Sequence, residues 1–173
     1  MSTLSSGTFS SPVQIPLNGL NPSLWSGSLG PNMVANGDDV FVAFEVYGDA
    51  IYIVHSADGG VNWDEPVAAF TPPSGRLATI PIIAVDNLGN PYVAYVNTNT
   101  VEADAYYGMV RSNDQGESFL EEVEVSAFSA DDEVCECCNG HIAIAENGDV
   151  YIAFRNNDNN QRDIWMAVST DGG

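Results

Sequence analysis

Three cysteines and a histidine form the densest group of reactive side chains in the sequence. Cys135 and Cys138 have a Cys-x-x-Cys spacing, Cys137 lies between them, and His141 follows three residues later. Thiolate and imidazole ligands at such short spacing could converge on one soft metal ion, such as zinc or copper. Covalent haem attachment is excluded, because Asn139 occupies the position where the haem motif requires a histidine. This run is therefore a candidate metal site.

The same cysteines could instead be oxidised. Cys137 and Cys138 could form a strained vicinal disulfide, or one pair could form an ordinary disulfide and leave one free thiol. Because the chain has three cysteines, a disulfide to a second molecule is also open. Disulfide and metal are thus competing hypotheses, with unmodified thiols as the third.

Acidic residues just before the cysteines offer a second type of metal ligand. Asp131, Asp132 and Glu133 are consecutive carboxylates, and calcium prefers oxygen ligands of this kind. Their spacing differs from that of the regular helix-loop-helix calcium site. We therefore keep calcium beside zinc and copper as a cofactor hypothesis.

The charge of the chain limits its partners. Its 173 residues include 24 acidic and 4 basic ones, which gives a formal charge of −20. Nucleic acid is disfavoured, because binding to it needs cationic side chains that displace counterions from phosphates. An anionic membrane surface is repelled in the same way, and no stretch approaches the roughly 20 apolar residues that cross a bilayer. Neither nucleic acid nor a membrane is therefore an expected partner.

The elements that must position these residues follow a repeat. An eight-residue run beginning Ser-x-Asp-x-Gly occurs twice in full, and its first five positions occur a third time, at spacings of 56 and 57 residues. The three copies contain Ser56, Asp58, Gly60 and Trp63, then Ser112, Asp114, Gly116 and Phe119, then Ser169, Asp171 and Gly173. Such a period indicates one supersecondary unit that is used three times.

Short apolar segments typical of strands come before each copy of the run. Phe41–Phe44, Tyr92–Tyr95 and Tyr151–Phe154 are rich in aromatic and β-branched residues, which favour half-buried strands. Each segment follows a turn with Asn and Gly residues that suit tight hairpins. With 16 glycines, 9 prolines and only 16% charged residues, the composition also favours short strands over amphipathic helices. The predicted unit has four antiparallel strands, like the blade of a β-propeller.

The run Ser-x-Asp-x-Gly-x-x-Trp/Phe resembles the Asp-box, or bacterial neuraminidase repeat, of sialidase-like β-propellers. The resemblance covers nearly the whole chain, since the boxes are in phase with the strand pattern. It implies a folding element in which Asp58, Asp114 and Asp171 accept hydrogen bonds from backbone amides, while the aromatic residue packs between sheets. The fold class that it implies is all-β, a propeller of four-stranded antiparallel blades with three blades in this chain.

We place blade 1 at residues 16–69, blade 2 at 70–127 and blade 3 at 128–173, in a single unit spanning 1–173. Residues 8–13 match residues 62–67, at the end of the first box and just after it, at an offset of 54 residues. We therefore expect residues 7–15 to be the fourth strand that blade 3 lacks. A ring of three blades would be too tight for twisted sheets. We therefore expect strand exchange between two chains and a homodimeric six-bladed ring. The alternatives are a piece of a longer propeller and an open, filament-forming assembly.

The face opposite the boxes carries the ligand site in sialidase-like propellers. In this sequence Arg76, Arg155, Arg162 and Glu45 fall on that face, and they are the expected ligand-binding residues. Sialidases bind the carboxylate of their substrate with three arginines, and guanidinium groups fit planar anions. The resemblance therefore implies an acidic sugar as ligand. The chain departs from the family pattern, because it lacks the Phe/Tyr-Arg-Ile-Pro segment of the first arginine.

The sequence assigns no catalytic set. Neither the tyrosine nucleophile of sialidases with its glutamate partner nor their aspartate acid/base can be placed, and Tyr47, Tyr106 and Tyr107 are more simply strand or packing residues. We therefore expect a non-catalytic propeller that binds a glycan or protein on its loop face. The alternative is a glycoside hydrolase of the exo-sialidase type, with a site assembled across subunits or from further blades. The second alternative is a self-assembling structural protein.

The first residues of the chain give little information about its location, because they lack the basic and apolar regions of a secretory signal. Either the chain is cytosolic or it begins after a cleaved signal. We expect an extracellular or periplasmic location.

Overall fold

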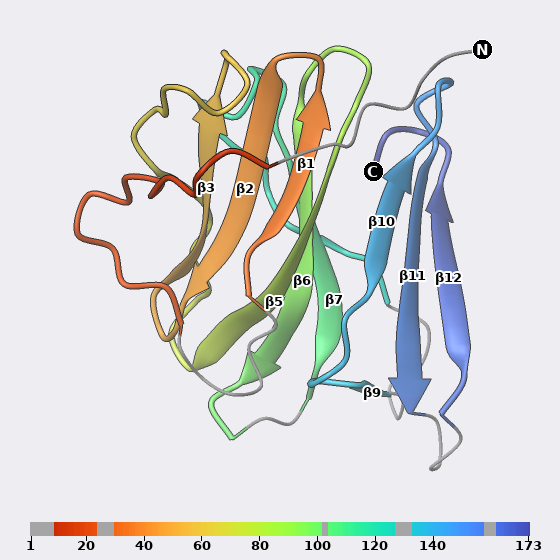
Figure 1. Ribbon diagram of the computed structural model, residues 1–173. Coiled ribbons are helices and arrows are strands. Elements are labelled where there is room, and N and C mark those ends of the chain that lie inside the picture. Colours follow the sequence, from red (N-terminus) through yellow and green to blue (C-terminus); the bar gives the residue numbers. More distant parts are fainter. Residues whose placement is uncertain (1–8, 24–29, 102–103, 127–132, 158–161) are drawn as a thin grey trace.

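The computed structural model describes residues 9–23, 30–101, 104–126, 133–157 and 162–173. The strands form three antiparallel sheets (Figure 1), and no helix in the described residues could cross a membrane. The first sheet contains β1 (Asn32–Asn36), β2 (Asp39–Val46), β3 (Ala50–Ser56) and β4 (Val67–Phe70). The second contains β5 (Arg76–Val85), β6 (Pro91–Asn99), β7 (Tyr106–Arg111) and β8 (Val123–Glu124). The third contains β9 (Glu133–Val134), β10 (His141–Ile144), β11 (Val150–Asn157) and β12 (Ile164–Ser169). The predicted fold class, all-β with four-stranded antiparallel sheets, is confirmed.

Tight turns set the register of the first hairpin in each sheet. Asp86 shows how, because its backbone N–H donates to the Asn90 carbonyl at 3.0 Å and its side-chain Oδ1 accepts the N–H groups of Leu88 and Asn90. Gly89 in this turn has a φ of +84°, which L side chains rarely adopt. A carboxylate that caps its own turn in this way fixes the pairing of β5 with β6.

Apolar side chains fill the two spaces between successive sheets. The space between the first and second sheets is filled by Phe41, Ile53, Val93, Tyr95 and Val110, all at most 1% exposed. The space between the second and third sheets is filled by Tyr92, Val96, Tyr107, Ile152 and Phe154. Burying each such side chain contributes about 1.5–3 kcal/mol. The strands β2 and β6 are buried on both faces, which explains why their sequences read as nearly continuous apolar runs.

The third sheet differs from the other two at both of its edges. Its first strand is split, because β9 and β10 both pair with β11, at Asn156–Asn157 and at Val150–Ala153 respectively, and the loop 135–140 lies between them. At the other edge β12 pairs only with β11 among the described residues. The loop that carries the cysteines is therefore an interruption of a strand.

The N-terminal segment, expected to be a fourth strand for the third sheet, lies elsewhere in this chain. Residues 9–15 form no strand, and Phe9 and Val13 are exposed. Ile15, Leu17 and Leu20 pack on the first sheet, against the cluster of Val42, Phe44 and Val54. Residues 7 and 8 lie outside the described residues. Exchange of this segment between two chains involves a second copy and stays a prediction, which the native mass of the protein tests.

The three Ser-x-Asp-x-Gly runs adopt the same turn. In the second copy Ser112 Oγ donates to Asp114 Oδ1 at 2.6 Å and accepts from Gly116 N at 2.8 Å, while Ser118 N donates to Asp114 at 2.9 Å. The first and third copies repeat the serine–aspartate and glycine–serine bonds. Hydrogen bonds from serine and from backbone amides lower the pKa of Asp58, Asp114 and Asp171, that of Asp114 to about 2.

The last glycine of this turn allows neighbouring sheets to approach each other closely. A Cβ on Gly116 would lie 2.9 Å from Ile53 Cδ1 of the first sheet, and a Cβ on Gly173 would collide with Met109 of the second sheet. Ile53 and Met109 occupy the same position in their strands, three residues before the serine of the turn. The same kind of contact, between a turn glycine and a side chain of the preceding sheet, therefore occurs at both boundaries between sheets.

Replacing Gly116 with alanine tests this contact. We expect Gly116→Ala to lower the free energy of unfolding by at least about 1 kcal/mol more than Gly148→Ala does. Both glycines have a similar positive φ, +94° and +88°, but nothing lies within 4 Å of a Cβ on Gly148. Urea unfolding of the two variants separates backbone strain from the clash with the first sheet. Equal losses of stability would show that the close approach does not matter.

The pKa of Asp114 predicts an acid-sensitive turn. A carboxyl group whose folded-state pKa lies below its unfolded value stabilises the fold above the unfolded value, near 3.8, and loses that contribution as the pH falls toward 2. We therefore expect the stability difference between the wild type and Asp114→Asn to be constant above about pH 5 and to shrink between about pH 4 and pH 2. Urea midpoints measured across this range check it. A difference that stays constant down to pH 2 would contradict the assignment.

Candidate functional site

The predicted ligand-binding residues lie at the end of the sheets opposite the Ser-x-Asp-x-Gly turns, at the lower end of Figure 1. We call this the loop end. Its described parts are residues 47–49, 71–75, 100–101, 104–105, 135–140 and 162–163. Arg155 and Arg76 extend from β11 and β5 at this end, which is where the sequence placed them.

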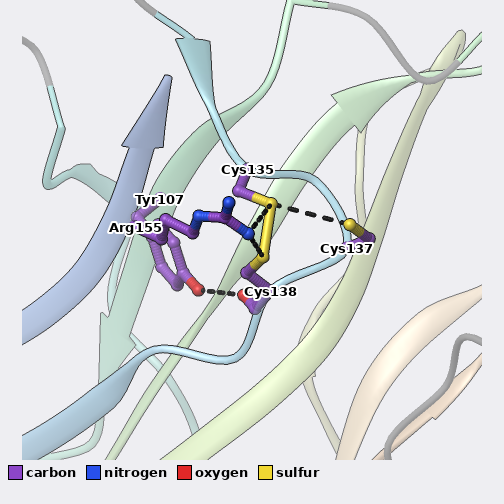
Figure 2. Close-up of a disulfide and its surroundings, with 5 residues drawn as sticks. All are labelled: Tyr107, Cys135, Cys137, Cys138 and Arg155. Carbon is purple, nitrogen blue, oxygen red and sulfur yellow. Dashed lines mark hydrogen bonds between the residues drawn. A yellow bond between two sulfur atoms is a disulfide. The ribbon is translucent and has the colours of Figure 1, made fainter. Parts of the chain in front are cut away.

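The cysteine loop at this end holds one disulfide and one free thiol. Cys135 and Cys138 are bonded, with their Cα atoms 5.4 Å apart, and Cys137 is free and exposed. The Cys137 Sγ lies 3.5 Å from the Cys135 Sγ (Figure 2). Of the pairings left open by the sequence, the structure thus forms the Cys-x-x-Cys bond, and the vicinal bond between Cys137 and Cys138 is absent.

Contacts from outside the loop hold it in place. Cys135 N donates to the Arg155 carbonyl at 3.0 Å, and Tyr107 Oη donates to the Cys138 carbonyl at 2.8 Å (Figure 2). Gly140 ends the loop, and a Cβ there would lie 2.9 Å from the Ala153 carbonyl and 3.0 Å from Tyr107 Oη. Burial raises the pKa of Tyr107, so its hydroxyl stays a donor at neutral pH. None of these contacts involves sulfur.

Arg155 places a cation beside the disulfide. Its Nη1 lies 3.2 Å from the Cys138 Sγ and 4.0 Å from the Cys135 Sγ. Among the described residues no carboxylate lies within ion-pair distance of this guanidinium, whereas Arg76 has one. Arg155 therefore differs from Arg76 in having no ion pair among the described residues.

The other predicted metal ligands do not join the cysteines. The three sulfur atoms lie within 4.8 Å of one another, and the imidazole of His141 is not part of this group. His141 is the exposed first residue of β10. Asp131 and Asp132 lie outside the described residues, as does the side chain of Glu133, so the calcium hypothesis stays a prediction. The donor set that the structure gathers is three sulfurs.

Arg76 is bound within the second sheet. Its Nη1 donates to Asp104 Oδ2 at 2.8 Å, its Nη2 donates to the Asp104 and Asn97 carbonyls at 2.8 and 3.1 Å, and its Nε donates to Asn97 Oδ1. The guanidinium carbon also lies 4.8 Å from the centre of the Tyr106 ring, a cation–π distance. All three guanidinium nitrogens of Arg76 thus donate hydrogen bonds to Asn97 or Asp104. We call this set of contacts the Arg76 clamp. The ligand-binding role predicted for Arg76 stays a prediction.

A half-buried carboxylate, Glu122, which the sequence did not reveal, completes this network. Glu122 Oε1 accepts from Tyr95 Oη at 3.0 Å and from Asn97 Nδ2 at 2.9 Å, and Oε2 accepts from Tyr106 Oη at 3.2 Å. A side chain at Gly108, in the middle of β7, would collide with Glu122. A glycine within a strand often marks such a close approach, and it was the one signal in the sequence that pointed here.

The network contains a tyrosine–glutamate pair. Burial and the nearby Glu122 carboxylate raise the pKa of Tyr106 to about 12, and burial also raises the pKa of Tyr95. A nucleophilic tyrosine needs a lowered pKa or a base that can take its proton. Tyr106 lacks the lowered pKa, and its hydroxyl donates to Glu122 Oε2.

Glu45 also connects two sheets. Its side chain is 5% exposed, and its Oε2 accepts a hydrogen bond from Ile80 N at 2.8 Å. Ile80 has a φ of +54° and lies where the pairing of β5 with β6 is irregular. Such a conformation is strained for a β-branched residue, and the bond from Glu45 supports it. Arg162, in contrast, is exposed just before β12.

No protein-family model matches the sequence, and no curated protein matches it. Solved structures do match. A protein of unknown function from Dyadobacter fermentans has a TM-score of 0.61 and 16% identity, over 83% of this chain and 47% of its own. An endo-arabinase from Bacteroides thetaiotaomicron has a TM-score of 0.59 and 13% identity, over 92% of this chain and 62% of its own. An ulvan lyase has a TM-score of 0.58 and 12% identity, over 80% and 40%.

These likenesses establish the class of fold. The chain is a β-propeller unit, and it spans less than two thirds of each of these structures. The endo-arabinase and the ulvan lyase are carbohydrate-active enzymes by their names. The likenesses extend to propellers outside the sialidase family and do not single that family out.

Removing the Arg76 side chain should destabilise the fold. We expect Arg76→Ala to lower the free energy of unfolding by about 1–3 kcal/mol, because the Asn97 side chain, fully buried, would lose its donor. Arg162→Ala removes an exposed guanidinium and should change stability by less than about 0.5 kcal/mol. Urea unfolding compares the two variants. Equal effects would mean that the clamp contributes nothing.

Proposed function

We propose that the chain is a non-catalytic propeller unit that binds a carboxylate-bearing glycan at its loop end, with Arg155 as the main cation. The observation that carries this proposal is that Arg155 has no carboxylate partner among the described residues, while Arg76 is paired with Asp104. A guanidinium offers a planar fork of donors that fits a sugar carboxylate. Arg162 adds a second, exposed guanidinium to the same end.

One solved structure of similar fold and the charge of the chain both support a short acidic sugar as the ligand. Ulvan lyase, one of the propellers of similar fold, was solved with a GlcA(1-4)Rha3S unit, and this sugar contains a carboxylate. With a formal charge of −20, this chain would repel a long polyanion. A short or terminal acidic sugar therefore suits it better. Tyr47, 56% exposed in the turn between β2 and β3, provides an aromatic surface at the same end against which a sugar ring can stack.

The non-catalytic part of the proposal rests on the state of the candidate groups. Burial and the nearby Glu122 carboxylate raise the pKa of Tyr106, and Arg76 is held by Asp104 and Asn97. Glu45 is buried in a bond to the backbone. The groups that a sialidase-type reaction would need are thus committed to holding the sheets together.

Titration with a matched pair of sugars tests this function. We expect calorimetry to show binding of 3′-sialyllactose but not of lactose, and Arg155→Ala to weaken that binding by roughly 10- to 100-fold, the range for a charge-assisted hydrogen bond. Arg155→Lys keeps the charge and should retain part of the affinity.

Two results would overturn the proposal. Equal affinity for lactose and 3′-sialyllactose would remove the role of the carboxylate. Turnover of a fluorogenic sialoside or arabinoside by the wild type, lost in Arg155→Ala, would favour the glycoside hydrolase alternative.

A further inference from the structure

The third cysteine has no role in a structural disulfide. Cys135 and Cys138 form the disulfide with each other. The exposed Cys137 thiol lies 3.5 Å from the Cys135 Sγ, and all three sulfurs lie within 4.8 Å of one another. A disulfide needs two sulfur atoms. A compact triangle of three is a donor set for a thiophilic metal ion, because soft thiolates select zinc or copper(I) over hard cations.

The loop is built to keep this triangle together without the sulfur–sulfur bond. The Cys135 N–H is bound to the Arg155 carbonyl, the Cys138 N–H closes a turn onto the Cys135 carbonyl at 3.2 Å, and Tyr107 holds the Cys138 carbonyl. None of these contacts involves a sulfur atom, so none of them depends on the disulfide bond. Strands β9 and β10 fix both ends of the loop against β11.

Arg155 supplies the charge that three thiolates would need. Three thiolates around a divalent cation leave a net charge of about −1, and placing it at a partly buried site is costly without a counter-charge. The Arg155 guanidinium already contacts two of the sulfurs, at 3.2 and 4.0 Å. It is therefore placed to stabilise the thiolate form of the site.

We propose that Cys135, Cys137 and Cys138 form a redox-gated site that binds one thiophilic metal ion, of the zinc class, only after the disulfide is reduced. Two thiols of the glutathione class supply the electrons: two RSH and the protein disulfide give RSSR and two cysteine thiols. Binding of Zn²⁺ to the three thiols then releases three protons. The three sulfurs would supply three of the four ligands that zinc usually binds.

Thiol counting and zinc titration of the full chain test the proposal together. The oxidised protein should show one reactive thiol and the reduced protein three. Zinc competition against a chromophoric chelator should show no binding to the oxidised protein and one equivalent bound by the reduced protein. Cobalt(II) in place of zinc should give a thiolate-to-metal charge-transfer band, which reports sulfur ligation directly.

Two variants distinguish zinc binding by the three sulfurs from zinc binding elsewhere on the chain. Cys137→Ser replaces an exposed side chain and keeps the disulfide pair. It should weaken zinc binding by the reduced protein by roughly tenfold or more, because losing even a residue that only orients a metal ligand lowers metal affinity by about 10- to 100-fold. His141→Ala is the matched control and should leave zinc affinity unchanged.

Three results would overturn the proposal. They are zinc binding by the oxidised protein as tight as by the reduced one, no binding after reduction, and equal losses in Cys137→Ser and His141→Ala. The glycan titration with the sialyllactose pair uses neither variant, so the two proposals fail independently.

Discussion

The arrangement of the three sheets depends on one kind of close contact, between the last glycine of the second and third Ser-x-Asp-x-Gly turns and a side chain of the preceding sheet. Gly116 meets Ile53, and Gly173 meets Met109. The serine and aspartate of the turn fix the backbone so that this glycine has a positive φ, +94° and +89° respectively. The carboxylate is therefore needed for its hydrogen bonds inside the turn, and the glycine is needed for the space that it leaves. Sheet spacing follows from both.

The buried polar side chain of Asn97 has hydrogen-bond partners for both atoms of its amide group. Asn97 is fully buried, yet its amide is satisfied by Arg76, Tyr106 and Glu122. A buried polar network of this kind is stable only when its members are paired, because each unpaired group costs about 1–3 kcal/mol. Arg76, Tyr106 and Glu122 each contact another member of this network, and these contacts stabilise the second sheet.

The fold could be predicted from the sequence because its signals are local. Alternating apolar segments and turn residues lie within one sheet at a time, and the same pattern returns in each sheet at spacings of 56 and 57 residues. The site could not be predicted in the same way, because its contacts join distant residues. Tyr107 and Cys138 are 31 positions apart, and Arg76 and Asp104 are 28 apart. The choice of disulfide partner was open for the same reason. Three cysteines within four positions allow every pairing, and contacts with Tyr107 and Arg155 hold the loop in which Cys135 bonds Cys138.

The region around the cysteine loop carries two features that cost stability. Asn156 is fully buried beside β9, and among the described residues neither polar atom of its side chain has a hydrogen-bond partner. The first strand of this sheet is broken into β9 and β10, with the cysteine loop between them. A sheet optimised for stability alone would have a continuous strand here and an apolar residue at 156. Departures from that optimum tend to gather at functional sites, and in the third sheet they coincide with three sulfurs and a guanidinium.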